Sequence, residues 1–199
     1  MSTRPIKKNL LFIAFITKIY ILVFFATNAY GKSYAEYSLQ YKESELIEEF
    51  HDWILLKNNR GDQEICYLLS TPISAQKTTY FRDKSFFIVT HSAQNVNEIS
   101  TSSGFYYKEN SNVEISFGSK KFYLFPYRNL AWANNGNSDI DIIKEMKKKD
   151  QFFVIGVSKD QELVIDIYSL VGFNQAYSKM NEECKNISNK NLLKNIKKS

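Results

Sequence analysis

The hydrophobic residues of this chain form one long apolar run near the start and many short runs after residue 50. The short runs are rich in β-branched and aromatic residues and are bounded by Gly, Pro, Asn and Asp, a pattern typical of β-strands. Seven runs show this pattern clearly: residues 53–56, 64–69, 85–90, 113–117, 121–125, 152–157 and 163–168. A weaker strand is expected over 97–105, with a bend at Gly104.

The turn residues between these runs predict hairpins. The segment 58–62 separates the first two runs, Gly118-Ser119 separates 113–117 from 121–125, and Lys159-Asp160 joins the last two. Short polar linkers of this kind connect antiparallel strands. Because proline has no N–H to donate to a ladder, we expect Pro72 and Pro126 to end their strands.

Two segments have helical spacing. Ser138-Asp139 is read as an N-cap before Ile140, Ile143 and Met146. The segment 172–184 places Phe173, Ala176, Tyr177 and Met180 on one stripe, and a single helical turn is expected at 44–49. About eight short strands with two short helices, one of them C-terminal, predict a mainly-β sandwich.

The long apolar run, 10–26, follows Arg4, Lys7 and Lys8 and precedes small residues near 27–31, which is the layout of a secretory signal peptide. The alternative is a retained membrane anchor. Lys18, inside the run, argues against the anchor, since a charge at the centre of a spanning helix costs about 2.5–3.5 kcal/mol. We therefore predict a signal peptide over 1–29 or 1–31, a leader or linker over 32–49, a β-sandwich domain over 50–184 and a basic, disordered tail over 185–199.

The formal charge of +5 would suit a nucleic-acid ligand, but it comes from the two ends of the chain. Residues 36–184 hold 16 Lys and Arg against 21 Asp and Glu, so the expected domain is acidic. The sequence therefore predicts no nucleic-acid partner. Contact with a membrane is expected only through the signal peptide, or weakly through the basic tail on anionic lipid.

The chain has two cysteines, Cys66 and Cys184. In an exported protein an even count predicts a disulfide, and two cysteines allow one pairing. Closing so long a loop stabilises a fold by roughly 4–5 kcal/mol in the chain-entropy model. Neither cysteine has the spacing of a redox or metal motif, so a structural bridge is preferred to two free thiols.

The order of motifs resembles the invasion-associated locus B family of α-proteobacterial exported proteins. The matching residues are Trp53, 65–70 with Pro72, 87–91, 97–100, 104–105, 121–125, 131–133, 168–173 and Cys184. The resemblance implies an immunoglobulin-like β-sandwich, an extracytoplasmic location and no enzyme activity or cofactor. It supplies no catalytic, cofactor-binding or metal-ligating set; only the cysteine pair carries over. The basic tail departs from the family, as does the small number of cysteines compared with some branches.

Four further features could have a role in binding. Arg60-Gly61-Asp62 has the form of an integrin-binding tripeptide, but a glycine turn between two strands explains it as well. His51 and His91 lie far apart in the sequence, and we expect both to be ordinary edge residues without a metal or catalytic role. Lys120-Lys121 and 147–149 are expected on solvated faces. Trp132, beside the loop 134–137, is the candidate contact residue.

Two functions follow. The first is a periplasmic or envelope-associated, non-enzymatic protein that acts through contacts with an unidentified envelope protein, with host-cell interaction as one setting. The second is a small-ligand-binding or enzymatic module with a cleft near Trp132 and His91. The first expects no convergent polar pocket of His, Asp or Glu, whereas the second needs one.

Overall fold

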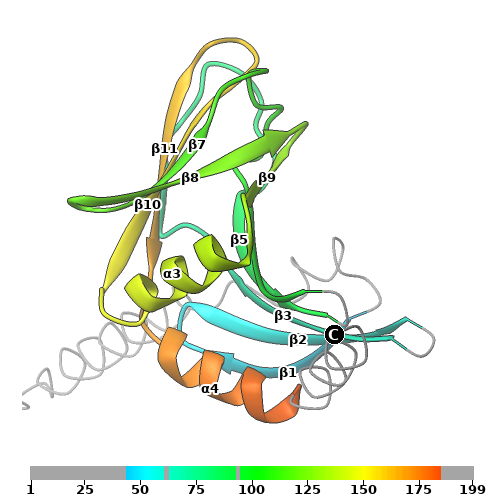
Figure 1. Cartoon of the computed structure of the whole chain (residues 1–199). Helices are drawn as coiled ribbons and strands as arrows, with labels where there is room; N and C mark the ends of the chain where they lie inside the picture. Colours follow the sequence, from blue (N-terminus) through cyan, green and yellow to red (C-terminus); the bar gives the residue numbers. More distant parts are fainter. Residues whose placement is uncertain (1–43, 61–62, 93–94, 185–199) are drawn as a thin grey trace, which may run out of the picture. The chain divides into compact units, whose positions relative to one another are not determined.

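The structure, a computed structural model, describes residues 44–60, 63–92 and 95–184. The strands are β1 Glu45–Phe50, β2 Trp53–Arg60, β3 Gln63–Ser70, β4 Ser74–Ala75, β5 Phe86–His91, β6 Val96–Ser102, β7 Val113–Phe117, β8 Lys120–Tyr127, β9 Leu130–Ala133, β10 Gln151–Val157 and β11 Leu163–Ser169. The helices are α3 Gly136–Met146 and α4 Phe173–Glu183 (Figure 1).

The strands form one antiparallel sheet in the order β1-β2-β3-β5-β6-β9-β8-β7-β10-β11-β4. Within the described residues, the mainly-β class and two helices are confirmed. The predicted hairpins are present too: β2 pairs with β3, β7 with β8 across Gly118, and β10 with β11. Gly118 has φ +83°, which suits a residue without a side chain at a two-residue turn.

The sheet curls so that β5 faces β10 and β11 across the core. Phe87 of β5 lies 4.8 Å from Phe152 and 5.9 Å from Tyr168, measured between ring centroids. Helix α4 covers the same face of β1, β2 and β3, with the Phe173 ring 4.9 Å from the ring of Trp53. All five aromatic side chains are fully buried, so one aromatic core joins both halves of the sheet.

The N-terminal part of the sheet corrects a prediction. The helical turn expected at 44–49 is wrong, since these residues enter strand β1, which pairs with β2 from Glu45 to Phe50. Sheet pairing supplies the backbone hydrogen bonds that a short isolated helical turn would leave weak. The remainder of the expected leader, 32–43, and the expected signal peptide and tail lie outside the described residues.

Strand β8 also runs further than expected, through Pro126 to Tyr127. Its pairing with β7 ends at Leu124, while its pairing with β9 continues through Pro126 and Ala131. At this end β8 has only one hydrogen-bonded neighbour, so the missing proline N–H is tolerated, as it is on edge strands.

Helix α3 begins earlier than the sequence suggested. Its N-cap is Asn135, whose side chain accepts hydrogen bonds from the backbone N–H groups of Asn137 and Ser138. The predicted cap at Ser138-Asp139 is therefore wrong. The Asp139 carboxylate instead accepts a 2.8 Å hydrogen bond from the Ile99 N–H on β6 and joins the helix to the sheet.

Helix α4 agrees with the predicted stripe, burying Phe173, Ala176 and Met180, and Cys184 caps its C-terminal end. Cys66 and Cys184 form the expected disulfide, with their Cα atoms 6.6 Å apart. The bond attaches the end of α4 to β3.

Candidate functional site

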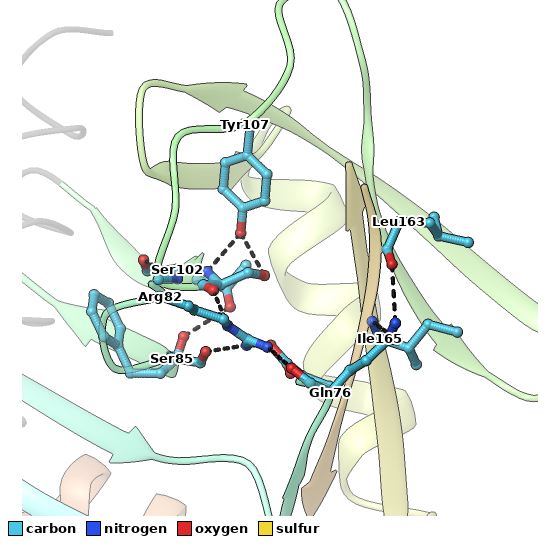
Figure 2. Close-up of polar contacts among 12 residues, drawn as sticks. Gln76, Arg82, Ser85, Ser102, Tyr107, Leu163 and Ile165 are labelled. Carbon is cyan, nitrogen blue, oxygen red and sulfur yellow. Dashed lines mark hydrogen bonds and ion pairs between the residues drawn. The ribbon is translucent and has the colours of Figure 1, made fainter. Parts of the chain in front are cut away.

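The guanidinium of Arg82, in the loop before β5, has four hydrogen-bond acceptors. It donates to the carbonyl oxygens of Ser103 at 2.6 Å and Gln76 at 2.8 Å, to Ser85 Oγ, and to the Asp166 carboxylate of β11 (Figure 2). The side chain of Arg82 is 9% exposed and that of Asp166 is fully buried. This Arg82 network therefore joins the loop to β11 and to the residue that follows β6.

Gln76 extends the sheet with its side chain. Its Nε2 donates to the Leu163 carbonyl oxygen at 3.2 Å, and its Oε1 accepts from the Ile165 N–H at 3.0 Å (Figure 2). Strand β4, directly before it, pairs with Asp166 and Ile167 of the same strand. The amide thus continues the β4 pairing along the edge of β11, which leaves less of that edge open to other strands.

Tyr107 joins the Arg82 network through Ser103. Its hydroxyl donates to Ser103 Oγ and accepts from the Ser103 N–H, both at 2.9 Å. Burial raises the pKa of Tyr107 to about 12. Burial also raises the pKa of Asp166, against the opposing effect of Arg82, and holds the pKa of Tyr168 well above its usual range.

These shifts arise mainly from desolvation. Each nitrogen of the Arg82 guanidinium has an acceptor within the protein, whereas Asp166 Oδ1 and the Tyr168 hydroxyl are buried without a hydrogen-bond partner. A buried arginine–carboxylate pair with several backbone acceptors fixes local geometry. We therefore read the Arg82 network as structural: it holds the loop of residues 76–85 in place.

Unlike the buried, polar Arg82 network, the exposed face of β8 and β9 carries aromatic side chains. Tyr123, Phe125 and Tyr127 alternate along β8 and are 51%, 46% and 66% exposed. Trp132 of β9, directly opposite Phe125 and half-buried, stacks on the Phe125 ring with a centroid distance of 5.8 Å. We call these four residues the aromatic surface.

Three aromatic side chains of β8 thus lie at the surface rather than in the core. Phe122, Leu124 and Pro126 alternate with them, so β8 carries apolar side chains on both faces. The unbroken apolar run over residues 122–127 was the sequence feature that could have indicated an exposed aromatic face. It was missed because a continuous apolar run also describes a strand buried on both sides.

The aromatic surface is the exposed end of a row that crosses the sheet. Cross-strand partners connect Phe125, Trp132 and Ser100, and then Ile88, Leu69 and Ile54 of the central strands. Directly opposed residues in antiparallel strands point to one face. The last three are at most 9% exposed, so accessible apolar area in this row lies on β8 and β9.

His91 and Trp132 do not share a site. His91 is the cross-strand partner of Cys66 on the core face, whereas Ala131 beside Trp132 is the residue directed to that core. Side chains of successive strand residues point to opposite faces, so Trp132 lies on the other face. His91 is also fully buried in an interior strand, and the expectation of an edge position is wrong for it.

The remaining candidates are separate from one another. His51 is exposed, with φ +55°, in the turn between β1 and β2. Arg60 ends β2, while Gly61 and Asp62 lie outside the described residues. The carboxylate of Glu64 lies within 4.8 Å of both cysteine sulfurs, but these sulfurs are bonded to each other and so are not metal ligands in this state.

The expected basic faces are largely ion-paired. Lys120 Nζ is 3.0 Å from Glu145 and Lys121 Nζ is 2.9 Å from Glu114. Lys147 Nζ lies 4.1 Å from the Tyr177 ring centroid. Exposed pairs of this kind contribute little stability, but they reduce the net positive charge offered to a partner.

Among the described helices, none has the length and apolar character needed to cross a bilayer. Comparison of the chain with protein-family models, curated proteins and solved structures finds no match.

Proposed function

We propose that this chain is an exported envelope protein of the invasion-associated locus B type that acts, without enzyme activity, through protein contacts at the aromatic surface. The observation that carries the proposal is the alternation of exposed Tyr123, Phe125 and Tyr127 beside the stacked Trp132. Tyr and Trp are enriched among the residues that dominate binding energy at protein interfaces. Exposed apolar side chains that lie side by side on a sheet are typical of an interaction site.

The disulfide supports the exported location, because such bonds persist mainly in oxidising compartments. The immunoglobulin-like sandwich belongs to the same proposal. Its support is the packing of β5 against β10 and β11 across the core, which is how two facing layers of a sandwich meet.

The alternative function, a cleft shared by Trp132 and His91, has no support from the arrangement of these residues on opposite faces of the sheet. Both ring nitrogens of His91 lie within hydrogen-bond distance of protein groups, which leaves neither directed at a ligand. We therefore do not carry this alternative further.

The test uses variants with matched exposure. Tyr123→Ala and Trp132→Ala remove parts of the aromatic surface, while Tyr106→Ala removes a tyrosine of similar exposure, 52%, outside it. The oxidised proteins are immobilised, incubated with the envelope fraction of the source organism and crosslinked. A bound partner is then titrated against each variant. We expect each aromatic-surface variant to weaken binding by about 2 kcal/mol, roughly 30-fold in Kd.

The Tyr106→Ala protein should bind as the unmodified protein does. Equal affinity for all three variants would show that the partner uses another face. Retained affinity after Phe125→Ala and Trp132→Ala are combined would end the proposal for the aromatic surface altogether.

A further inference from the structure

His91 lies at the junction of β5, β6 and α4 and is fully buried there. Its backbone is paired with Cys66 on one side and with Val96 on the other. The pairing with β6 shifts register at this point, between Thr90 and His91. The ring therefore occupies an irregular place in the sheet, next to the residue that attaches α4 covalently.

The hydrogen bonds define the protonation state of the ring. Asn97 N–H donates to Nδ1 at 3.2 Å, so Nδ1 carries a lone pair and no proton. Nε2 lies 3.2 Å from Asn181 Oδ1 and is the ring donor. The Asn181 amide nitrogen donates to the Tyr177 carbonyl oxygen at 2.7 Å, which directs Oδ1 to His91.

The neutral ring is thus satisfied at both nitrogens, whereas the cation loses the bond from the Asn97 N–H. A proton added to Nδ1 would face the Asn97 N–H, placing two donors together. Tyr177 reinforces the neutral arrangement, since its hydroxyl donates to Asn97 Oδ1 at 2.7 Å. Asn97 itself holds φ +68°, a conformation that costs free energy unless its neighbours maintain it.

The charged groups of the surrounding elements do not offset a ring cation. On β3, Glu64 pairs through Oε2 with Lys57 at 3.0 Å, and its buried Oε1 has no hydrogen-bond partner. On β6, Glu98 is paired with Thr90 on the face opposite His91. On α4, Lys179 pairs with Glu183, and the residue in contact with the ring nitrogen is an amide.

We propose that His91 is an acid-sensitive contact: protonation of Nδ1 breaks its hydrogen bond with Asn97 and loosens the packing of the β6 start against α4. This regulation is independent of the aromatic surface and adds a pH response to the fold. The Cys66–Cys184 bond keeps the end of α4 attached, so the opening is local rather than global.

The sign of the pH dependence follows from the environment of the ring. Burial lowers the pKa of His91 below its ordinary value of 6.5, against smaller opposing effects of the Asn181 and Thr90 hydrogen bonds. The folded state then binds this proton more weakly than the unfolded state. The stabilisation from neutral His91 is complete above pH 6.5 and is lost as the pH falls below it.

The experiment follows the ring nitrogens and the Asn97 amide by NMR on the oxidised, signal-free protein between pH 8 and pH 4.5. The chain has only two histidines, so His51→Asn assigns both rings and serves as the control. Every protein in this experiment also carries Asp139→Asn, because burial raises the pKa of the Asp139 carboxyl on α3 to about 6, within the same pH range. We expect the Nε2–H tautomer at His91 and a fall of at least tenfold in the exchange protection of Asn97 below pH 6.

Two variants separate this from general acid unfolding. His91→Gln should remove the pH-dependent fall, and Asn181→Asp should move it to higher pH because a carboxylate favours the ring cation. The proposal is overturned by an Nδ1–H tautomer, by Asn97 protection that is constant to pH 4.5, or by the same fall in His91→Gln. A protection loss shared equally by β10 amides would also overturn it.

Discussion

The ion pair between Arg82 and Asp166 provides the most quantitative test of the fold. Replacing Arg82 with Met keeps much of the side-chain volume but leaves the fully buried Asp166 carboxylate without its cation. Removing one partner of a buried pair costs about 3–5 kcal/mol. The change also releases the carbonyl acceptors of Ser103 and Gln76, so we expect a loss near the upper end, about 5 kcal/mol.

A double-mutant cycle isolates the pair. Asp166→Leu should cost less, about 3 kcal/mol, because the guanidinium retains its other acceptors. The double variant should then recover at least about 2 kcal/mol relative to the sum of the single changes. Urea unfolding of the oxidised proteins, with the slope m checked for each variant, measures all four corners of the cycle.

The pH dependence gives an independent check. Burial raises the pKa of Asp166, and loss of Arg82 removes the group that opposes this rise. In Arg82→Met, the folded state therefore binds a proton at Asp166 more tightly than the unfolded state does. The loss in free energy of unfolding relative to the unmodified protein should then be smaller at pH 5 than at pH 7. Additivity within about 0.5 kcal/mol, together with a deficit independent of pH, would refute the reasoning.

Three further predictions concern the disulfide, a glycine and a carboxyl group. Changing both Cys66 and Cys184 to Ala should lower the free energy of unfolding by about 4–5 kcal/mol, as measured in urea; a loss below 1 kcal/mol would contradict this. Gly172→Ala, whose Cβ would lie 2.0 Å from a β1 carbonyl oxygen, should destabilise far more than Gly118→Ala, which has open space and a similar φ; equal melting temperatures would count against it. Burial raises the pKa of Asp139 to about 6, so its contribution to stability falls as the pH rises through 6, and Asp139→Asn should be more stable at pH 7 but not at pH 4.

Local patterns were enough to predict most of the sheet and the terminal helix. The hairpins at Gly118 and at Lys159-Asp160 depend on alternation and short turns, and both kinds of signal lie within a few residues. The stripe that includes Phe173 and Met180 is likewise local, and it places Cys184 in line with the core. The cysteine pairing needed no geometry, since two cysteines have one partner each.

The features that the sequence did not predict depend on contacts between residues far apart in the chain. Arg82 and Asp166 are 84 residues apart, and no spacing rule relates them. Asp139 has the local form of a helix cap, but the Ile99 N–H of another strand captures its carboxylate. The exposure of Tyr123, Phe125 and Tyr127 depends on which face of β8 meets the core, and a strand that is apolar on both faces does not reveal this.

The position of Cys184 at the end of α4 also sets an order of events during synthesis. A chain that emerges from its N-terminus presents Cys66 long before its partner, because 118 residues separate them. Until α4 and Cys184 have been synthesised, the Cys66 thiol can react only with thiols of other molecules. Covalent closure therefore cannot precede the synthesis of α4, and a chain truncated within α4 would retain Cys66 as a thiol without its partner.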